Sequence, residues 1–262
     1  MNFSKRYAIT FGEVAILHVG LSELGQKAAE GYSVEELSEI ANKLEEKDIE
    51  VELINLTDKL PKKYSNGNDA SVLIIRNGVN HLLKKEDAAD KLYLEQDKKV
   101  TYDKKYFDTR RSKTLNKRAR YNIVFGDEEV TPSSDYKQHS VKAFSNVPNL
   151  NKVRKKLKKF LGNKAKKLNA EGNEYYEDNS GIGFHGDAER RIVICLSLGK
   201  SSTLRYYWRR SGSSDNFFGP IDVKVNHGDI YVMSEKATGH DWKKRSKVRL
   251  VHAAGSKKYI DK

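Results

Sequence analysis

The sequence predicts an α+β protein whose C-terminal half is a β-sandwich or jelly roll, preceded by one amphipathic helix. Two observations support this prediction. Apolar residues recur at helical spacing from Leu150 to Leu161, opposite a lysine-rich face, with Asn149 as the expected cap. Beyond residue 173, short β-like segments alternate with glycine-containing turns, which is typical of antiparallel layers rather than of a parallel sheet. The expected strands are residues 191–198, 204–208, 221–225, 229–233 and 247–253.

Residues 1–95 are expected to form a small N-terminal α/β unit of unknown role, ahead of a larger domain over residues 106–262. The unit has strand-like segments at residues 7–11, 51–56 and 71–76. Between the first two, Ser33 and Glu36 have the spacing of a capping box that begins a helix. The polar stretch 85–105 is the best candidate for a linker, with an exposed excursion as the alternative.

The positive charge of the chain is large and unevenly placed. The 262 residues carry a formal net charge of +13. A localised basic surface attracts polyanions, of which nucleic acid is the commonest, and the alternative is a solubilising lysine-rich face. The two basic clusters are Arg110, Arg111, Lys113, Lys117, Arg118 and Arg120, and then Lys152, Arg154, Lys155, Lys156, Lys158, Lys159, Lys164, Lys166 and Lys167.

The single cysteine, Cys195, excludes an intramolecular disulfide and a cysteine-based zinc site. It lies in an apolar run, which favours a buried structural thiol. No stretch approaches the roughly 18 apolar residues of a membrane span, and the N-terminus lacks the features of a secretory signal. We therefore expect an intracellular, reducing location, in cytoplasm or nucleus.

A histidine and an aspartate two residues apart, His185 and Asp187, form the clearest chemical motif. On an extended chain both side chains point to one face and can reach one ion. His240, after the predicted strand 229–233, is the expected third ligand; His227 competes, but its Gly-Asp neighbours favour a turn. Two histidines and a carboxylate form the facial triad of non-haem iron(II). Arg249, nine residues after His240, is suited to pair with the distal carboxylate of 2-oxoglutarate.

Over about residues 118–255 the chain resembles the AlkB-like branch of the iron(II)- and 2-oxoglutarate-dependent oxygenases. Many ordered matches of this kind are more specific than the metal motif alone, and residues 183–187 and 233–236 are most similar to a branch found in large DNA viruses. The resemblance implies a double-stranded β-helix, or jelly-roll, catalytic core with supporting helices. The matching motifs are Phe125-Gly126-Asp127, Asn173-Glu174-Tyr175, Gly183-Phe184-His185-Gly186-Asp187, Asn226-His227-Gly228-Asp229, His240 and Arg249.

The resemblance also implies roles for individual residues. Asn173 and Tyr175 match positions that contact 2-oxoglutarate, and Glu189 matches an acidic position that reads the exocyclic group of a target base. Phe125 and Asp127 match a loop near the substrate. The basic run, with Arg118 and Arg120 at its end, would line a nucleic-acid path. For each substrate-side residue, a plain structural role is the alternative.

The chain departs from the family pattern in one place. Relatives often end the last strand with Arg-x-Asn-x-Thr-x-Arg, whereas residues 249–255 keep only the first arginine and have Gly255 at the second position. The implied anchoring of the co-substrate by Arg249 is unaffected, but the pocket near the reacting centre is expected to differ.

The sequence thus predicts an iron(II)- and 2-oxoglutarate-dependent dioxygenase that uses O2, and a repair-type oxidative demethylation of N-alkylated bases in single-stranded or damaged DNA or RNA. One alternative keeps the centre and hydroxylates a protein or an unmodified nucleotide. Another is a nucleic-acid-binding module with a degenerate centre. In a third, residues 1–95 determine the partner.

Overall fold

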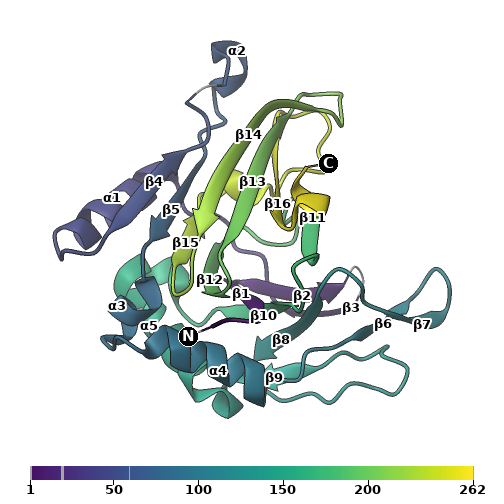
Figure 1. The fold of residues 1–262 in the computed structure, drawn as a ribbon. Helices are drawn as coiled ribbons and strands as arrows, with labels where there is room; N and C mark the ends of the chain where they lie inside the picture. The colour runs from purple at the N-terminus through teal and green to yellow at the C-terminus, as the bar shows by residue number, and fades with distance from the viewer. Residues whose placement is uncertain (1, 19–20, 59, 262) are drawn as a thin grey trace.

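Two facing β-sheets, with helices against the outer face of the larger one, make up the molecule (Figure 1). The computed structural model describes residues 2–18, 21–58 and 60–261. Within these residues the larger sheet has eight strands in the order β4-β5-β15-β12-β1-β10-β8-β9, and the smaller has four in the order β11-β16-β13-β14. All neighbouring strands are antiparallel except the pair β8 and β9. The α+β jelly-roll class predicted from the sequence is confirmed.

The elements have the following bounds. The large sheet contains β1 (Arg6–Gly12), β4 (Val51–Asn55), β5 (Ser71–Ile75), β8 (Tyr121–Gly126), β9 (Val141–Ala143), β10 (Asn169–Tyr175), β12 (Val193–Gly199) and β15 (Ile230–Met233). The small sheet contains β11 (Gly181–His185), β13 (Ser202–Arg209), β14 (Asn216–Val225) and β16 (Arg249–Gly255). Two hairpins are formed by β2 (Val14–His18) with β3 (Leu21–Gly25) and by β6 (Lys105–Asp108) with β7 (Lys113–Asn116). The helices are α1 (Val34–Glu45), α2 (Lys62–Ser65), α3 (Gly78–Leu83), α4 (Ala88–Lys99), α5 (Pro148–Leu161) and α6 (Lys257–Ile260), with short 3-10 turns η1 (Phe144–Asn146), η2 (Asn163–Ala165) and η3 (Lys236–Thr238).

The first strand of the chain lies in the middle of the large sheet. β1 pairs with β10 on one side and with β12 on the other, and β4 and β5 extend the same sheet beyond β15. The sheet therefore continues across the expected boundary between residues 95 and 106, and residues 1–95 do not form a separate unit. Since β1 has a neighbour on both edges, its backbone hydrogen bonds depend on strands more than 150 residues away.

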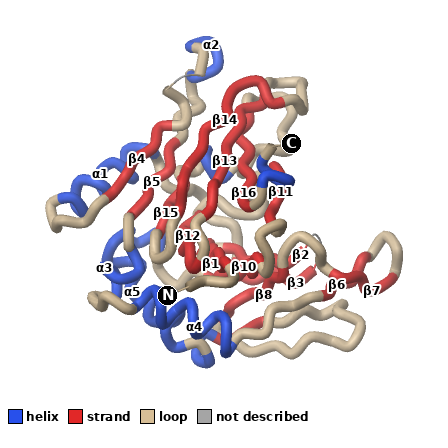
Figure 2. The backbone as a smooth tube through the Cα atoms, in the orientation of Figure 1, coloured by secondary structure: helices blue, strands red, loops and turns tan. Residues whose placement is uncertain are grey.

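Two apolar cores hold the layers together. One lies between the large sheet and helices α1, α3, α4 and α5, and the other between the two sheets. In the second core Trp208 is fully buried, and its indole Nε1–H donates to the carbonyl of Leu56 at 2.8 Å. Figure 2 shows the helices gathered mainly along the large sheet, which leaves the space between the sheets to strands and loops.

Helix α4 occupies the stretch where a linker or excursion was expected. It packs through Leu92 and Tyr93, which are buried, and its Glu95 caps the next helix. The Glu95 carboxylate accepts from the backbone N–H groups of Asn149 and Leu150 at 2.8 and 2.9 Å. A buried carboxylate thus serves as the cap that was expected of Asn149, and helix α5 begins at Pro148, two residues before the Leu150 that a cap at Asn149 implies.

Several local expectations are confirmed. Ser33 and Glu36 form the reciprocal capping box at the start of α1. Cys195 is buried, and burial raises the pKa of its thiol to about 11. Across the described residues, none of the helices combines the length and apolar character that a membrane crossing needs.

Candidate active site

A cavity of about 490 Å³ opens between the two sheets, at the end where the inter-sheet core stops. Strand alternation places its walls, because successive side chains of a strand point to opposite faces. Every second residue of β1 from Arg6 to Thr10, and of β10 from Glu171 to Tyr175, lines the cavity. The residues between them on β1 are buried in the core on the helix side. The volume lies within the roughly 300–1,000 Å³ that small-molecule sites occupy.

Three side chains at one wall of the cavity can hold a metal ion. His185 is the last residue of β11, Asp187 follows it in the next turn, and His252 lies on the neighbouring strand β16. Their candidate ligand atoms all lie within 4.8 Å of one another. His185 and His252 are direct partners in the antiparallel register, with ring centroids 4.6 Å apart.

The protonation of these groups suits a metal ligand set. His185 Nδ1 lies 2.8 Å from the carbonyl of Gly183, so it donates its proton there and leaves the Nε2 lone pair free, 3.8 Å from Asp187 Oδ1. His252 is buried, and its Nδ1 has no hydrogen-bond partner among the described residues. Burial first, and then the positive charge of Arg190, hold the pKa of His252 well below its usual range. Two imidazoles and one carboxylate are the donor set that non-haem iron(II) takes.

His240, the third ligand expected from the sequence, does not join this cluster. Its Nδ1 lies 3.0 Å from the carbonyl of Glu235, and its Nε2 lies 3.6 Å from a carboxylate oxygen of the same residue. It lines a different hollow, together with Glu235 and Lys236. Gly239, in the left-handed conformation at φ 69°, ends the η3 turn, and the residue after it, His240, lies against Glu235.

Arg249, the expected anchor of 2-oxoglutarate, is occupied by backbone groups. Its guanidinium donates to the carbonyls of Trp242 and Arg210 at 3.2 and 3.0 Å, and also to that of Ser213. It is buried and does not line the 490 Å³ cavity. These bonds hold together the two loops at the far end of the small sheet, so the arginine has a structural position.

Gly255, where the family pattern has a second arginine, cannot carry a side chain. Its φ is 118°, and a Cβ atom there would lie 2.5 Å from the Cα of Gly181 on the adjacent strand. The absence of that arginine is therefore enforced by the close approach of β11 and β16.

The co-substrate residues expected from the resemblance, Asn173 and Tyr175, both line the cavity from β10. Beside them lies Arg6, which the sequence analysis did not single out. Its guanidinium carbon is 3.7 Å from the centroid of the Tyr175 ring, and its buried Nη2 has no hydrogen-bond partner among the described residues. Asn173 accepts from Arg120 Nε at 2.5 Å.

An ion-pair network forms the floor of the cavity near Asp187. Arg190 Nη2 lies 3.0 Å from Glu171 and 2.8 Å from Glu189, and all three residues line the cavity. Burial works against the charge of Arg190, but the carboxylates of Asp187, Glu171 and Glu189 outweigh it and raise its pKa. Glu189, expected to read a base, thus lines the cavity, and its carboxylate forms an ion pair with Arg190.

Phe125 and Asp127, expected near the substrate, lie elsewhere. Phe125 is fully buried in the helix-side core, with its ring centroid 6.1 Å from that of Phe144. The Asp127 side chain is 77% exposed and pairs with Arg154 at 2.5 Å. Neither residue lines the cavity.

A second cavity, of about 700 Å³, lies against the β6–β7 hairpin and the start of β8. It shares Arg120 with the first cavity. Among the described residues that line it there are five cationic side chains and no carboxylate. The cations are Lys105, Arg111, Lys117, Arg118 and Arg120. Four residues of the basic run, Arg111, Lys117, Arg118 and Arg120, therefore line a cavity that adjoins the one with the candidate metal ligands.

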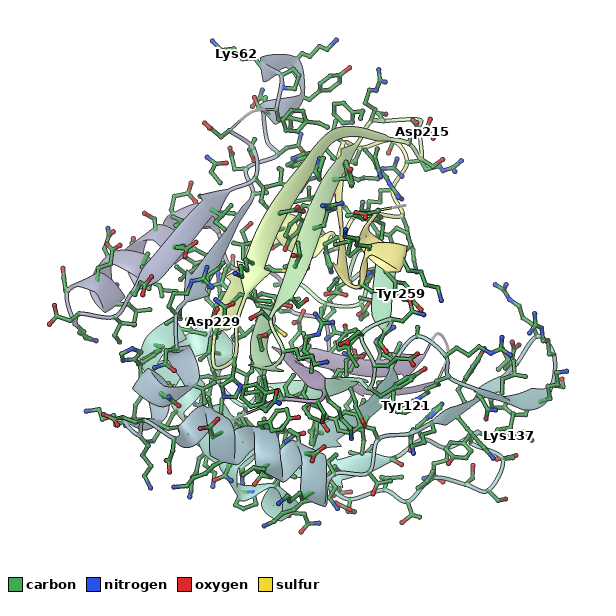
Figure 3. All side chains as sticks on the ribbon, viewed as in Figure 1. Lys62, Tyr121, Lys137, Asp215, Asp229 and Tyr259 are labelled. Carbon is green, nitrogen blue, oxygen red and sulfur yellow. The ribbon has the colours of Figure 1, made fainter. Side chains whose placement is uncertain are left out.

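One lysine of this basic cavity has a shifted pKa, and aromatic rings lie near the cavity. Burial lowers the pKa of Lys117 to about 8, against the opposing attraction of Asp103. The rings of Tyr121 and Tyr176 stack nearby with centroids 4.2 Å apart. Figure 3 labels Tyr121 and Lys137 on the side where the hairpin projects, and Lys137 Nζ lies 5.1 Å from the ring centroid of Phe107 on β6.

The second basic cluster is divided between structure and surface. Arg154 donates to the carbonyl of Leu168, and Lys164 pairs with Glu36 at 2.7 Å. Exposed lysines of the cluster lie on the outer face of α5 and just after it, away from the hairpin in Figure 1. They are Lys152, Lys155, Lys158, Lys159, Lys166 and Lys167.

Comparison with known proteins identifies the family of the chain. Residues 78–244 match the sequence model of the 2OG-Fe(II) oxygenase superfamily, a span that includes His185, Asp187 and His240 and ends before His252. The chain is also 35% identical to an uncharacterized protein of Acanthamoeba polyphaga mimivirus over 254 residues, 96% of each chain. The chain belongs to the 2OG-Fe(II) oxygenase superfamily. It is therefore a dioxygenase that uses iron(II), 2-oxoglutarate and O2.

Proposed function

We propose that this dioxygenase is an AlkB-like enzyme that removes N-linked methyl groups from bases of single-stranded nucleic acid. One observation carries the proposal: a basic cavity without carboxylates shares Arg120 with the cavity that holds the candidate metal ligands. One base of a polyanionic strand held in the basic cavity could then reach the cavity with the candidate metal ligands.

We further propose His185, Asp187 and His252 as the ligands of the iron. The close grouping of their donor atoms and the unpartnered Nδ1 of His252 support this set over one that contains His240. When bound together, iron(II) and 2-oxoglutarate direct one oxygen atom of O2 into a C–H bond and the other into succinate, with release of CO2. Asn173 and Tyr175 are placed to orient the co-substrate from β10.

On an N-methylated base the balance is simple. The methyl group becomes N–CH2–OH, the C–N bond then breaks, and the products are formaldehyde and the N–H form of the base. The chain contributes orientation, exclusion of water and charge. Glu189 lines the cavity 2.8 Å from Arg190, and its carboxylate is placed to accept a hydrogen bond from an exocyclic amino group.

A single strand suits this arrangement better than a duplex. A base must leave its stack to enter a cavity between two sheets, and the cost is lowest where it has no pairing partner. The stacked rings of Tyr121 and Tyr176 lie next to Arg118 of the basic cavity, whose carbonyl accepts from Tyr176 Oη at 2.8 Å. Stacking and phosphate contact together favour single strands with little dependence on sequence.

The test is to measure succinate and formaldehyde from the full-length protein with iron(II), 2-oxoglutarate and O2. The substrates are single-stranded DNA and RNA that carry N-methylated adenine or cytosine, and the controls are unmethylated strands and the His185→Ala variant. We expect both products in equal amounts with methylated strands, and neither product above background with His185→Ala.

Succinate formed without formaldehyde on every strand would contradict demethylation and favour hydroxylation of a protein or an unmodified nucleotide. Equal product formation from duplexes and single strands would contradict the proposed strand preference.

A further inference from the structure

We propose that Arg6, on the first strand of the chain, binds the distal carboxylate of 2-oxoglutarate, so that the N-terminal strand is an integral part of the active site. This inference rests on the co-substrate assigned above and on the cavity that holds the candidate metal ligands. It replaces Arg249, which the sequence analysis expected in this role.

The position of Arg6 follows from strand register. It pairs with Tyr175 on one side and Gly199 on the other, in the middle of the large sheet. Alternation along β1 then turns Arg6, Ala8 and Thr10 toward the space between the sheets, where all three line the 490 Å³ cavity. The short side chain of Ala8 leaves room between the guanidinium and the rest of the cavity.

The guanidinium of Arg6 is buried and under-bonded. The residue is 8% exposed, and Nη2 has no hydrogen-bond partner among the described residues. It is held in place by stacking on the Tyr175 ring at 3.7 Å. Buried charged donors are normally paired, because an unpaired one is costly. A buried guanidinium with a free Nη2 at the wall of a ligand cavity indicates an anionic ligand, and its two-pronged geometry matches a carboxylate.

The other cations of the cavity are less suited to this role. Arg190 is already paired with Glu171 and Glu189. Arg120 donates to Asn173 and faces the second cavity as well. Lys243 is exposed. Outside the cavity, Arg249 is bonded to three backbone carbonyls, so a ligand would have to displace these bonds.

Hydroxyl groups complete the proposed carboxylate site. Ser197 and Ser202 line the same cavity from β12 and β13, and Tyr231 lines it from β15. Tyr231 is partly buried, and desolvation raises the pKa of its phenol well above the usual range, so the hydroxyl keeps its proton and can donate it. Hydroxyl donors beside a guanidinium are a common way to satisfy the remaining lone pairs of a buried carboxylate.

The experiment compares two ligands on the full-length protein, loaded with Co(II) under anaerobic conditions so that no turnover occurs. The ligands are 2-oxoglutarate and 2-oxopentanoate, which has the same chain length without the distal carboxylate. Binding to wild type, Arg6→Gln and Arg6→Lys is measured by calorimetry. Co(II) absorption and thermal melting check that each variant keeps its metal site and fold.

Wild type is expected to prefer 2-oxoglutarate over 2-oxopentanoate. Arg6→Gln should bind 2-oxoglutarate at least about tenfold more weakly and 2-oxopentanoate as wild type does, because only 2-oxoglutarate has the distal carboxylate. Arg6→Lys, which keeps the charge but not the two-pronged geometry, should fall between the two. If either folded variant keeps the wild-type preference for 2-oxoglutarate, Arg6 is not the anchor. If wild type itself binds Co(II) but neither ligand, the proposed site fails as a whole.

Discussion

The salt dependence of strand binding gives a quantitative test of the basic cavity. Each phosphate contact to a single strand contributes a slope of about −0.7 to the plot of log affinity against log salt. Five cations line the cavity, so full engagement predicts a slope of about −3.5 and a loss of roughly 100-fold in affinity between 50 and 200 mM salt. Replacement of Lys105, Arg111 and Arg118 by glutamine should reduce the slope to about −1.4 and the loss to roughly 7-fold.

Fluorescence anisotropy of a labelled 12-nucleotide strand, titrated at several salt concentrations, measures both quantities. The matched control replaces Lys152, Lys155 and Lys158 of α5 by glutamine, which removes the same formal charge from a surface that does not adjoin the active site. The reasoning is refuted if the α5 variant changes the slope as much as the variant of Lys105, Arg111 and Arg118, because binding would then depend on net charge and not on the basic cavity.

Three further predictions concern single residues. Glu95→Ala should lower the free energy of unfolding by about 2–4 kcal/mol in urea denaturation, because two backbone N–H groups at the start of α5 lose their acceptor; a change below about 0.5 kcal/mol would contradict the capping role. The pKa of Lys117 is lowered from 10.5 to about 8, so between these pH values the folded state has released a proton that the unfolded state still holds. The free energy of unfolding of wild type, relative to that of Lys117→Met, should therefore rise by about 2–3 kcal/mol between pH 8 and 10.5. A difference that stays constant with pH would contradict this shift. Gly255→Arg, which restores the family's second arginine, should cost at least about 2 kcal/mol or prevent folding, because its Cβ meets Gly181; a thermal melt like that of wild type would show that this approach is not tight.

The parts of the fold that depend on local sequence were predictable. The capping box at Ser33 and the apolar face of α5 lie within single elements, so their spacing is visible without any knowledge of partners. The position of β1 was not predictable in this way. Its partners, β10 and β12, lie more than 150 residues away, and alternation along Arg6–Gly12 does not indicate which strands it joins.

The cluster of His185, Asp187 and His252, the candidate metal ligands, could be predicted only in part, for a similar reason. His185 and Asp187 are neighbours in the sequence, and their common face follows from strand geometry. His252 lies within the apolar run of β16 and reads as a core residue, and only the pairing of β16 with β11 brings it opposite His185. His240 had the more conspicuous setting after a glycine, but the η3 turn directs its ring to Glu235.

A signal for Arg6 was present in the sequence. The pattern Arg-x-Asn-x-Thr-x-Arg, sought at the end of the last strand, is matched better by Arg6–Gly12 than by Arg249–Gly255. The first segment keeps both the arginine and Thr10, and the second keeps only the arginine.

The most direct test of the central claim is metal binding by the two competing histidine variants. Co(II) or Mn(II) is titrated into the purified, metal-free wild type, His252→Ala and His240→Ala, with affinity measured by calorimetry and the Co(II) spectrum recorded. We predict that His252→Ala binds the metal at least about 100-fold more weakly, and that His240→Ala binds it as wild type does. Loss of a residue that only hydrogen-bonds a metal ligand costs about 10- to 100-fold in affinity, so loss of a ligand itself should cost at least as much. Tight binding by His252→Ala together with its loss in His240→Ala would contradict the site described here.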